Sequence, residues 1–131
     1  QNLARTNNKT ELLHQLHLLG DEAAAHFRRL LPTALAHYKQ LFIVMHPPPF
    51  QESVWHEGNT PDDDNDFLPH FACKAAGDVL LELVPQYPDC EVTVLCGHTH
   101  GRGEAQVFSN LTVLTGGAVY RNPAIQRIFT L

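Results

Sequence analysis

The sequence is poor in the residue types that mark several protein classes. Its 131 residues include three cysteines, one methionine, one tryptophan and only 8% aromatic residues. The cysteines, Cys73, Cys90 and Cys96, are odd in number and form no Cys-x-x-Cys pair. This usage argues against a disulfide framework, so we expect reduced thiols that fill the core of a cytoplasmic protein.

Positive charge and long apolar runs are also scarce. Nine lysines and arginines stand against fourteen aspartates and glutamates, which gives a formal net charge of -5. This balance argues against general nucleic-acid binding through phosphate neutralisation. No apolar stretch is long enough to span a bilayer, and the first residues lack the pattern of a secretory signal. Because there is no initiator methionine, we expect the chain to begin within a longer protein.

What the sequence does contain fits one globular unit. A hydrophobic content of 44% over 131 residues supports one modest core, so we expect 1–131 to be a single domain or part of one. Apolar spacing predicts helices over 10–19, 21–38 and 71–84, the first stopped by Gly20 and the second bent or broken by Pro32. Residues 50–69 are predicted to form a polar loop of unusual length.

Short apolar runs predict the strands. Leu41–Met45 and Val92–Cys96 are continuous apolar runs, which are typical of strands covered on both faces in an α/β protein. Further strands are predicted over 104–109, 111–115 and 125–131. Ligands of such open sheets bind outside the carboxyl ends of the strands, so residues that follow the first two runs are expected to converge on one site.

Histidines follow both of these runs. His46 ends the first run, and Gly97-His98-Thr99-His100-Gly101 ends the second. A neutral imidazole is the commonest protein ligand for transition metals, and the two glycines allow a sharp turn with room for an ion. The pattern predicts that His46, His98 and His100 are metal ligands.

These motifs resemble the carboxyl-terminal half of a calcineurin-like metallophosphoesterase. The family signature runs D-x-H, G-D, G-N-H-[DE], a lone H and G-H-x-H, and this sequence matches only the last two elements. The resemblance implies the carboxyl-terminal part of a four-layer α/β/β/α sandwich with mixed sheets. Strands 41–45 and 92–96 would lie in the carboxyl-terminal sheet, and 104–131 would continue that sheet.

The resemblance also implies a dinuclear site. His46 and His98 would hold one ion and His100 its neighbour, the pair being divalent or trivalent manganese, iron or zinc. Such ions activate a hydroxide that hydrolyses a phosphomonoester, phosphodiester or pyrophosphate bond. The family's bridging aspartate, asparagine ligand and proton donor would come from a missing amino-terminal half of the same protein. This chain alone is therefore expected to be inactive.

Other residues carry weaker hypotheses. Arg102, just after the double histidine, is a candidate to bind the phosphate of a small phosphorylated substrate through its planar guanidinium. In the long loop, His56 and His70 are the other histidines that are expected to approach a substrate. Two alternatives remain: an inactive scaffold of the same fold that binds a partner protein, and a zinc module that uses histidines only.

Overall fold

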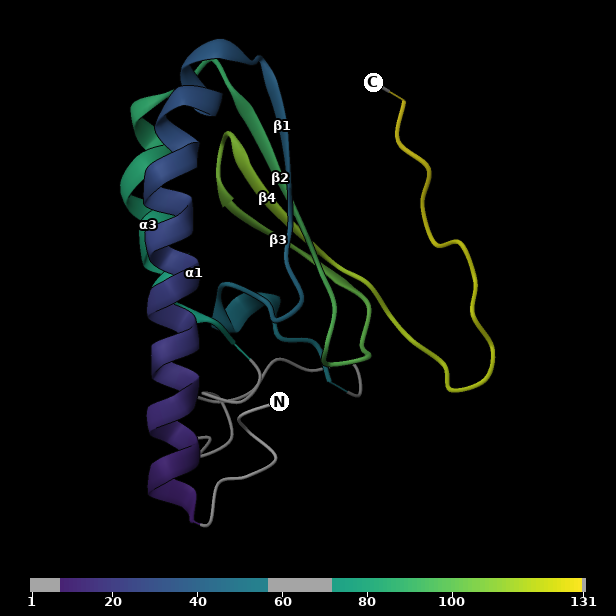
Figure 1. The fold of residues 1–131 in the computed structure, drawn as a ribbon. Coiled ribbons are helices and arrows are strands. Elements are labelled where there is room, and N and C mark those ends of the chain that lie inside the picture. Colours follow the sequence, from purple (N-terminus) through teal and green to yellow (C-terminus); the bar gives the residue numbers. More distant parts are fainter. Residues whose placement is uncertain (1–7, 57–71, 131) are drawn as a thin grey trace.

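A computed structural model describes residues 8–56 and 72–130 of the chain as a mixed α/β structure. Two helices and a four-stranded mixed sheet make up its regular structure (Figure 1). In chain order the elements are α1 (Lys9–His37), β1 (Gln40–Val44), the short 3₁₀ helix η2 (Gln51–Ser53), α3 (Lys74–Leu83), the short 3₁₀ helix η3 (Val84–Gln86), β2 (Glu91–Cys96), β3 (Gly103–Phe108) and β4 (Leu111–Thr115). Neither described helix is long and apolar enough to cross a membrane.

Helix α1 is continuous where the sequence predicted two helices. That prediction was wrong because packing overrides both residues that were expected to break the helix. Gly20 lies where α1 meets the start of α3, and a β-carbon there would be 3.6 Å from that of Ala75. Pro32 is inside the helix between the buried Leu31 and Leu35, whose packing in the core offsets the lost hydrogen bond.

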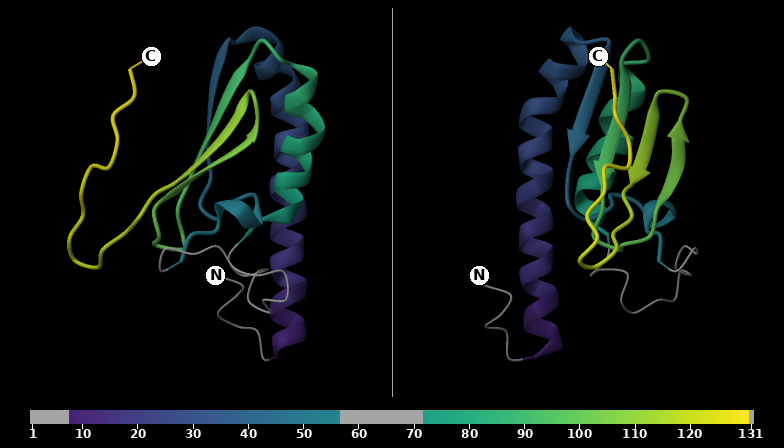
Figure 2. Two further views of the ribbon diagram at one scale, coloured as in Figure 1. Left: turned by 180° about the vertical axis from the view of Figure 1, so that it is seen from behind. Right: turned by 90° about the vertical axis from the view of Figure 1, so that its right-hand side faces the viewer.

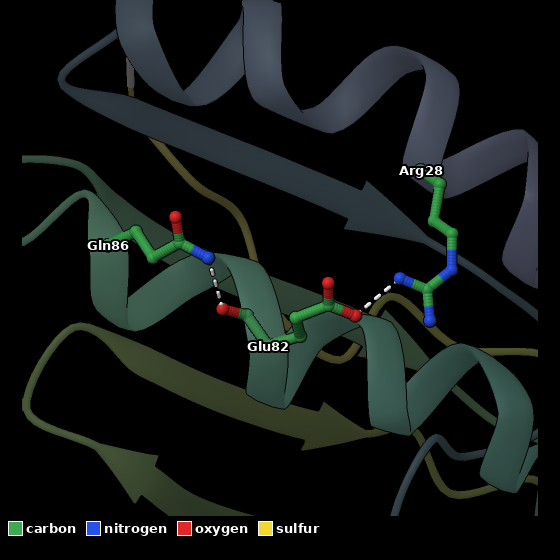
Figure 3. Close-up of polar contacts among 3 residues, drawn as sticks. All are labelled: Arg28, Glu82 and Gln86. Carbon is green, nitrogen blue, oxygen red and sulfur yellow. Dashed lines mark hydrogen bonds and ion pairs between the residues drawn. The ribbon is translucent and has the colours of Figure 1, made fainter.

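Helix α3 lies beside α1 on the same face of the sheet (Figure 2). The helix predicted over 71–84 is present over Lys74–Leu83, and Val84 begins the 3₁₀ helix η3. Figure 3 shows the polar link between the helices, in which Arg28 of α1 pairs with the carboxylate of Glu82. The side chain of Gln86 donates to the Glu82 carbonyl at 2.8 Å and so satisfies an acceptor at the end of α3.

The strands lie in the order β1-β2-β4-β3. β1, β2 and β4 are mutually parallel, and β3 runs antiparallel to β4. The predicted strands 41–45, 92–96, 104–109 and 111–115 are confirmed, with ends that differ by at most one residue. The predicted strand at 125–131 is wrong over 125–130, where the described chain runs in irregular structure.

The two faces of the sheet differ in what covers them. The face toward the helices carries the buried core residues, namely Ile43, Val92, Val94, Leu111 and Val113, all at most 6% exposed. On the opposite face, Val44 is 76% exposed and Phe42 makes an edge contact with Phe129 at 5.0 Å. The described helices cover one face only (Figure 1), so within the described residues no helix covers the opposite face, although the continuous apolar runs predicted strands covered on both faces.

Candidate metal centre

The ends of β1 and β2 bring two of the predicted ligands together. The strands are parallel neighbours, with Val44 paired to Leu95, so their carboxyl ends reach the same edge of the sheet. Backbone bonding continues beyond the strands, because the Gly97 N–H donates to the His46 carbonyl at 3.0 Å. The positions of His46 and His98 are thus fixed by the backbone as well as by their side chains.

The two imidazoles lie in direct contact. His98 Nδ1 is 3.1 Å from His46 Nε2, and the ring centroids are 4.9 Å apart at an interplanar angle of 76°. One nitrogen donates to the other in this arrangement, with the roles set by the tautomers. The predicted convergence of these two residues is therefore present in the structure.

The turn that carries the double histidine has unusual backbone geometry. His98 has φ 72° and His100 has φ 62°, both in the left-handed region that costs a residue with a β-carbon about 1–2 kcal/mol. Between them, the Thr99 N–H donates to the Gly97 carbonyl at 2.9 Å and closes the turn. Such strain is typical of backbone that is held in place by its surroundings at a functional site.

His100 contacts a different segment of the chain from His98. Its ring makes an edge contact with Tyr120 at 5.1 Å, and its carbonyl accepts from the Ala118 N–H at 3.0 Å. Over 8–56 and 72–130, no three histidine, cysteine, aspartate or glutamate side chains are grouped so that they could hold one ion. The described residues thus offer one close pair, His46 and His98, with His100 next to it in sequence.

The segment of Trp55 and His56 packs directly on the turn, a contact that the sequence did not predict. The Gly101 N–H donates to the Trp55 carbonyl at 3.1 Å, and a β-carbon at Gly101 would lie only 2.3 Å from that oxygen. A β-carbon at Gly103 would lie 2.1 Å from the Trp55 indole. His56 follows, with Nδ1 3.4 Å from the Thr99 carbonyl oxygen. The glycines at 101 and 103 were the sequence signal for this close approach.

Two buried polar atoms accompany this contact. Thr99 is 4% exposed, and neither its Oγ1 nor the indole Nε1 of Trp55 has a hydrogen-bond partner among the described residues. Burying a polar group without a partner costs free energy, and such groups cluster where a structure serves something other than stability.

The thiol next to this turn is half-buried. Burial raises the pKa of Cys96, and a hydrogen bond with Thr115, at 3.4 Å from Sγ to Oγ1, offsets this only in part. Burial likewise raises the pKa of Cys90. Cys90 belongs to the hydrophobic core and Cys96 packs against that core.

Arg102 lies on the face of the sheet that carries no helix. It lines a groove of about 380 Å³ between the sheet and the carboxyl-terminal segment, together with Arg127, Phe129 and Leu114. Its predicted role in substrate binding stays a prediction. His70, the other loop histidine singled out from the sequence, lies outside the described residues.

No protein-family model, curated protein or solved structure matches the chain. The resemblance to metallophosphoesterases thus rests on the sequence motifs alone.

Proposed function

We propose that this chain is the carboxyl-terminal part of a calcineurin-like metallophosphoesterase that hydrolyses a phosphomonoester, phosphodiester or pyrophosphate bond. In this proposal His46 and His98 bind one transition-metal ion and His100 binds its neighbour. One observation carries the proposal, namely the 3.1 Å separation of His46 Nε2 and His98 Nδ1 at the ends of adjacent parallel strands.

This separation suits two ligands of one ion. With metal–nitrogen bonds of about 2.0–2.1 Å, two imidazole nitrogens lie about 3.3 Å apart at a tetrahedral angle and about 2.9 Å apart at a right angle. The observed 3.1 Å falls between these values. An ion would lie off the line between the two nitrogens, so the shared proton would have to leave and the rings would have to turn toward the ion. The donor type also fits, since imidazole suits zinc, iron and similar ions.

The protein's own part in such a site is to hold the ligands in place. The bond from Gly97 to the His46 carbonyl ties the two strand ends together, and both His98 and His100 have left-handed backbone. When bound, a pair of ions of this kind polarises the phosphoryl group and supplies a nucleophilic hydroxide. The three histidines would supply part of the ligand set, and the rest would come from a segment amino-terminal to this chain.

The exposed face of the sheet supports the proposed four-layer sandwich. Phe42, Val44, Leu95 and Leu114 lie on the face without helices together with the polar Thr93 and Thr112, and Val44 is 76% exposed. Exposed apolar side chains on one face of a sheet are often covered by another layer of structure. In the proposed sandwich, a second sheet from the amino-terminal half covers this face and brings the remaining ligands to the same edge.

Metal content and hydrolysis by the full-length protein test the proposal. The protein is loaded with manganese, iron or zinc, and hydrolysis of p-nitrophenyl phosphate, bis-p-nitrophenyl phosphate and pyrophosphate is measured. We expect metal-dependent turnover that H46A and H98A each reduce by at least about 100-fold, together with a loss of bound metal, because each removes a ligand.

The matched control is H37A, because His37 is an exposed histidine at the far end of α1. This variant should keep wild-type metal content and activity. If the wild-type protein is folded but shows no metal-dependent hydrolysis, the enzymatic proposal fails. That result would favour the inactive scaffold that binds a partner protein. Stoichiometric zinc binding by this chain alone would instead favour the histidine-only zinc module.

A further inference from the structure

We infer that Tyr120 is a positioning residue for His100, whose imidazole it holds in place to bind the second metal ion of the proposed phosphoesterase. This inference rests on the proposed function, in which His100 is a ligand of that ion. It adds a residue that contacts neither ion and acts through the imidazole of His100 alone. Its basis is the contact between the two rings.

The His100 ring is oriented by an aromatic contact. Its centroid lies 5.1 Å from that of the Tyr120 ring, at an interplanar angle of 78°. Aromatic rings favour such edge contacts at centroid distances of about 4.5–7 Å. Metal-binding histidines usually donate their other ring N–H to an oxygen, which fixes the ring. No hydrogen bond of this kind holds His100 among the described residues, so the Tyr120 ring is the group that orients the imidazole.

The backbone places Tyr120 beside His100. The Ala118 N–H, two residues before the tyrosine, donates to the His100 carbonyl at 3.0 Å. The Asn122 N–H then donates to the Val119 carbonyl at 3.1 Å and closes a turn that contains Tyr120. The tyrosine is therefore brought to the imidazole by main-chain bonds on both sides of it.

The Tyr120 side chain contributes little to the stability of the fold. It is 83% exposed and does not belong to the hydrophobic core or to the side chains packed against that core. Its removal would leave no cavity in the core, since only exposed surface surrounds most of the ring. An effect on metal binding can thus be separated from an effect on stability.

Three substitutions isolate the contribution of the ring. Y120F keeps the aromatic ring, Y120L removes it, and H100A removes the proposed ligand. The metal-free full-length protein is titrated with zinc by calorimetry, and we expect two binding events in the wild type, of which H100A loses one. Y120L should weaken that same event by about 3- to 10-fold, which is the range expected for one aromatic contact. Y120F should bind both ions as the wild type does.

The matched control is F129L. Phe129 lies on the same carboxyl-terminal segment and makes a similar edge contact, with Phe42 at a centroid distance of 5.0 Å. F129L should therefore keep both binding events. Y120L should keep the wild-type midpoint of urea unfolding, because the side chain that it shortens is exposed.

Proton NMR of the metal-free protein tests the ring contact directly. An aromatic ring shifts the resonances of nuclei beside it, and H100A identifies the resonances of the His100 imidazole by their loss. These resonances should move to the position of a solvated histidine in Y120L. They should stay shifted in Y120F and F129L.

The inference and the proposed function fail in different ways. Equal binding of both ions by the wild type and Y120L overturns the inference alone. Equal impairment of Y120F and Y120L also overturns it, because the hydroxyl and not the ring would then be responsible. If the wild type binds no second ion and H100A matches it, the proposed metal centre fails as well. None of these measurements depends on hydrolysis.

Discussion

Polar groups at the amino ends of the parallel strands have hydrogen-bond partners, whereas some of those at the carboxyl ends have none among the described residues. At the amino ends, the side-chain nitrogen of Asn110 lies 3.1–3.2 Å from the carbonyls of Val84, Tyr87 and Cys90. At the carboxyl ends, His98 and His100 have left-handed backbone, and Thr99 keeps a buried hydroxyl without a described partner. One end serves the stability of the fold, and the other carries unfavourable features that a ligand site would explain.

The largest expected loss of stability comes from a substitution that pushes apart the segments of Trp55 and Gly101, which meet at the carboxyl ends of the strands. In G101A the new β-carbon would lie 2.3 Å from the Trp55 carbonyl oxygen, so the backbone of one segment must move. We expect a loss of about 3 kcal/mol in the free energy of unfolding, measured by urea denaturation of the full-length protein. G97A is the matched control, because a β-carbon at Gly97 meets no atom within 4 Å. Equal stability of both variants would contradict the close contact.

A smaller effect is expected at the amino ends. N110A removes the donor that serves three carbonyls where η3 leads into β2. We expect a loss of about 2 kcal/mol in unfolding free energy, because buried acceptors lose their partner while the fold keeps its topology. Activity per folded molecule should stay at the wild-type level. If N110A kept the wild-type free energy of unfolding but bound less metal, the amino and carboxyl ends of the strands would not be separate in function.

The smallest expected change in stability is the difference between substitutions of two buried threonines, Thr115 and Thr99. Thr115 donates to the Ser53 carbonyl at 2.7 Å, whereas Thr99 Oγ1 has no described partner. T115V should therefore lower the unfolding free energy by about 1–2 kcal/mol, and T99V should leave it unchanged or raise it by up to about 1 kcal/mol. Thermal and urea denaturation of both variants provide the measurement. A comparable loss in T99V would mean that the hydroxyl is satisfied by a partner outside the described residues.

The sequence predicted the sheet better than the helices, and there is a physical reason. The runs at 41–45 and 92–96 are short, apolar and closed by proline or glycine, so local pattern and tertiary structure agree. In α1, Gly20 and Pro32 weaken the helix locally, and only packing against α3 and the core shows that it continues. The exposed Ile125 and Ile128 looked like strand residues, but they have no strand to pair with in the described chain.

The site was predictable where it depends on strand ends. His46 and His98 could be brought together because parallel strands end at a common edge. The roles of Trp55 and Thr99 depend on a contact between segments more than forty residues apart. A single sequence contains no periodic signal for such a contact, and only the glycines at 101 and 103 hinted at it.

The left-handed backbone of His98 and His100 also limits which residues can replace them. Their backbone favours glycine and asparagine and disfavours β-branched residues, whatever the side chains do. Substitutions of His98 and His100 by valine or isoleucine would therefore be penalised by conformation alone. During evolution, positions 98 and 100 are therefore expected to accept only a few residue types, even in a related protein in which the two imidazoles no longer have a function.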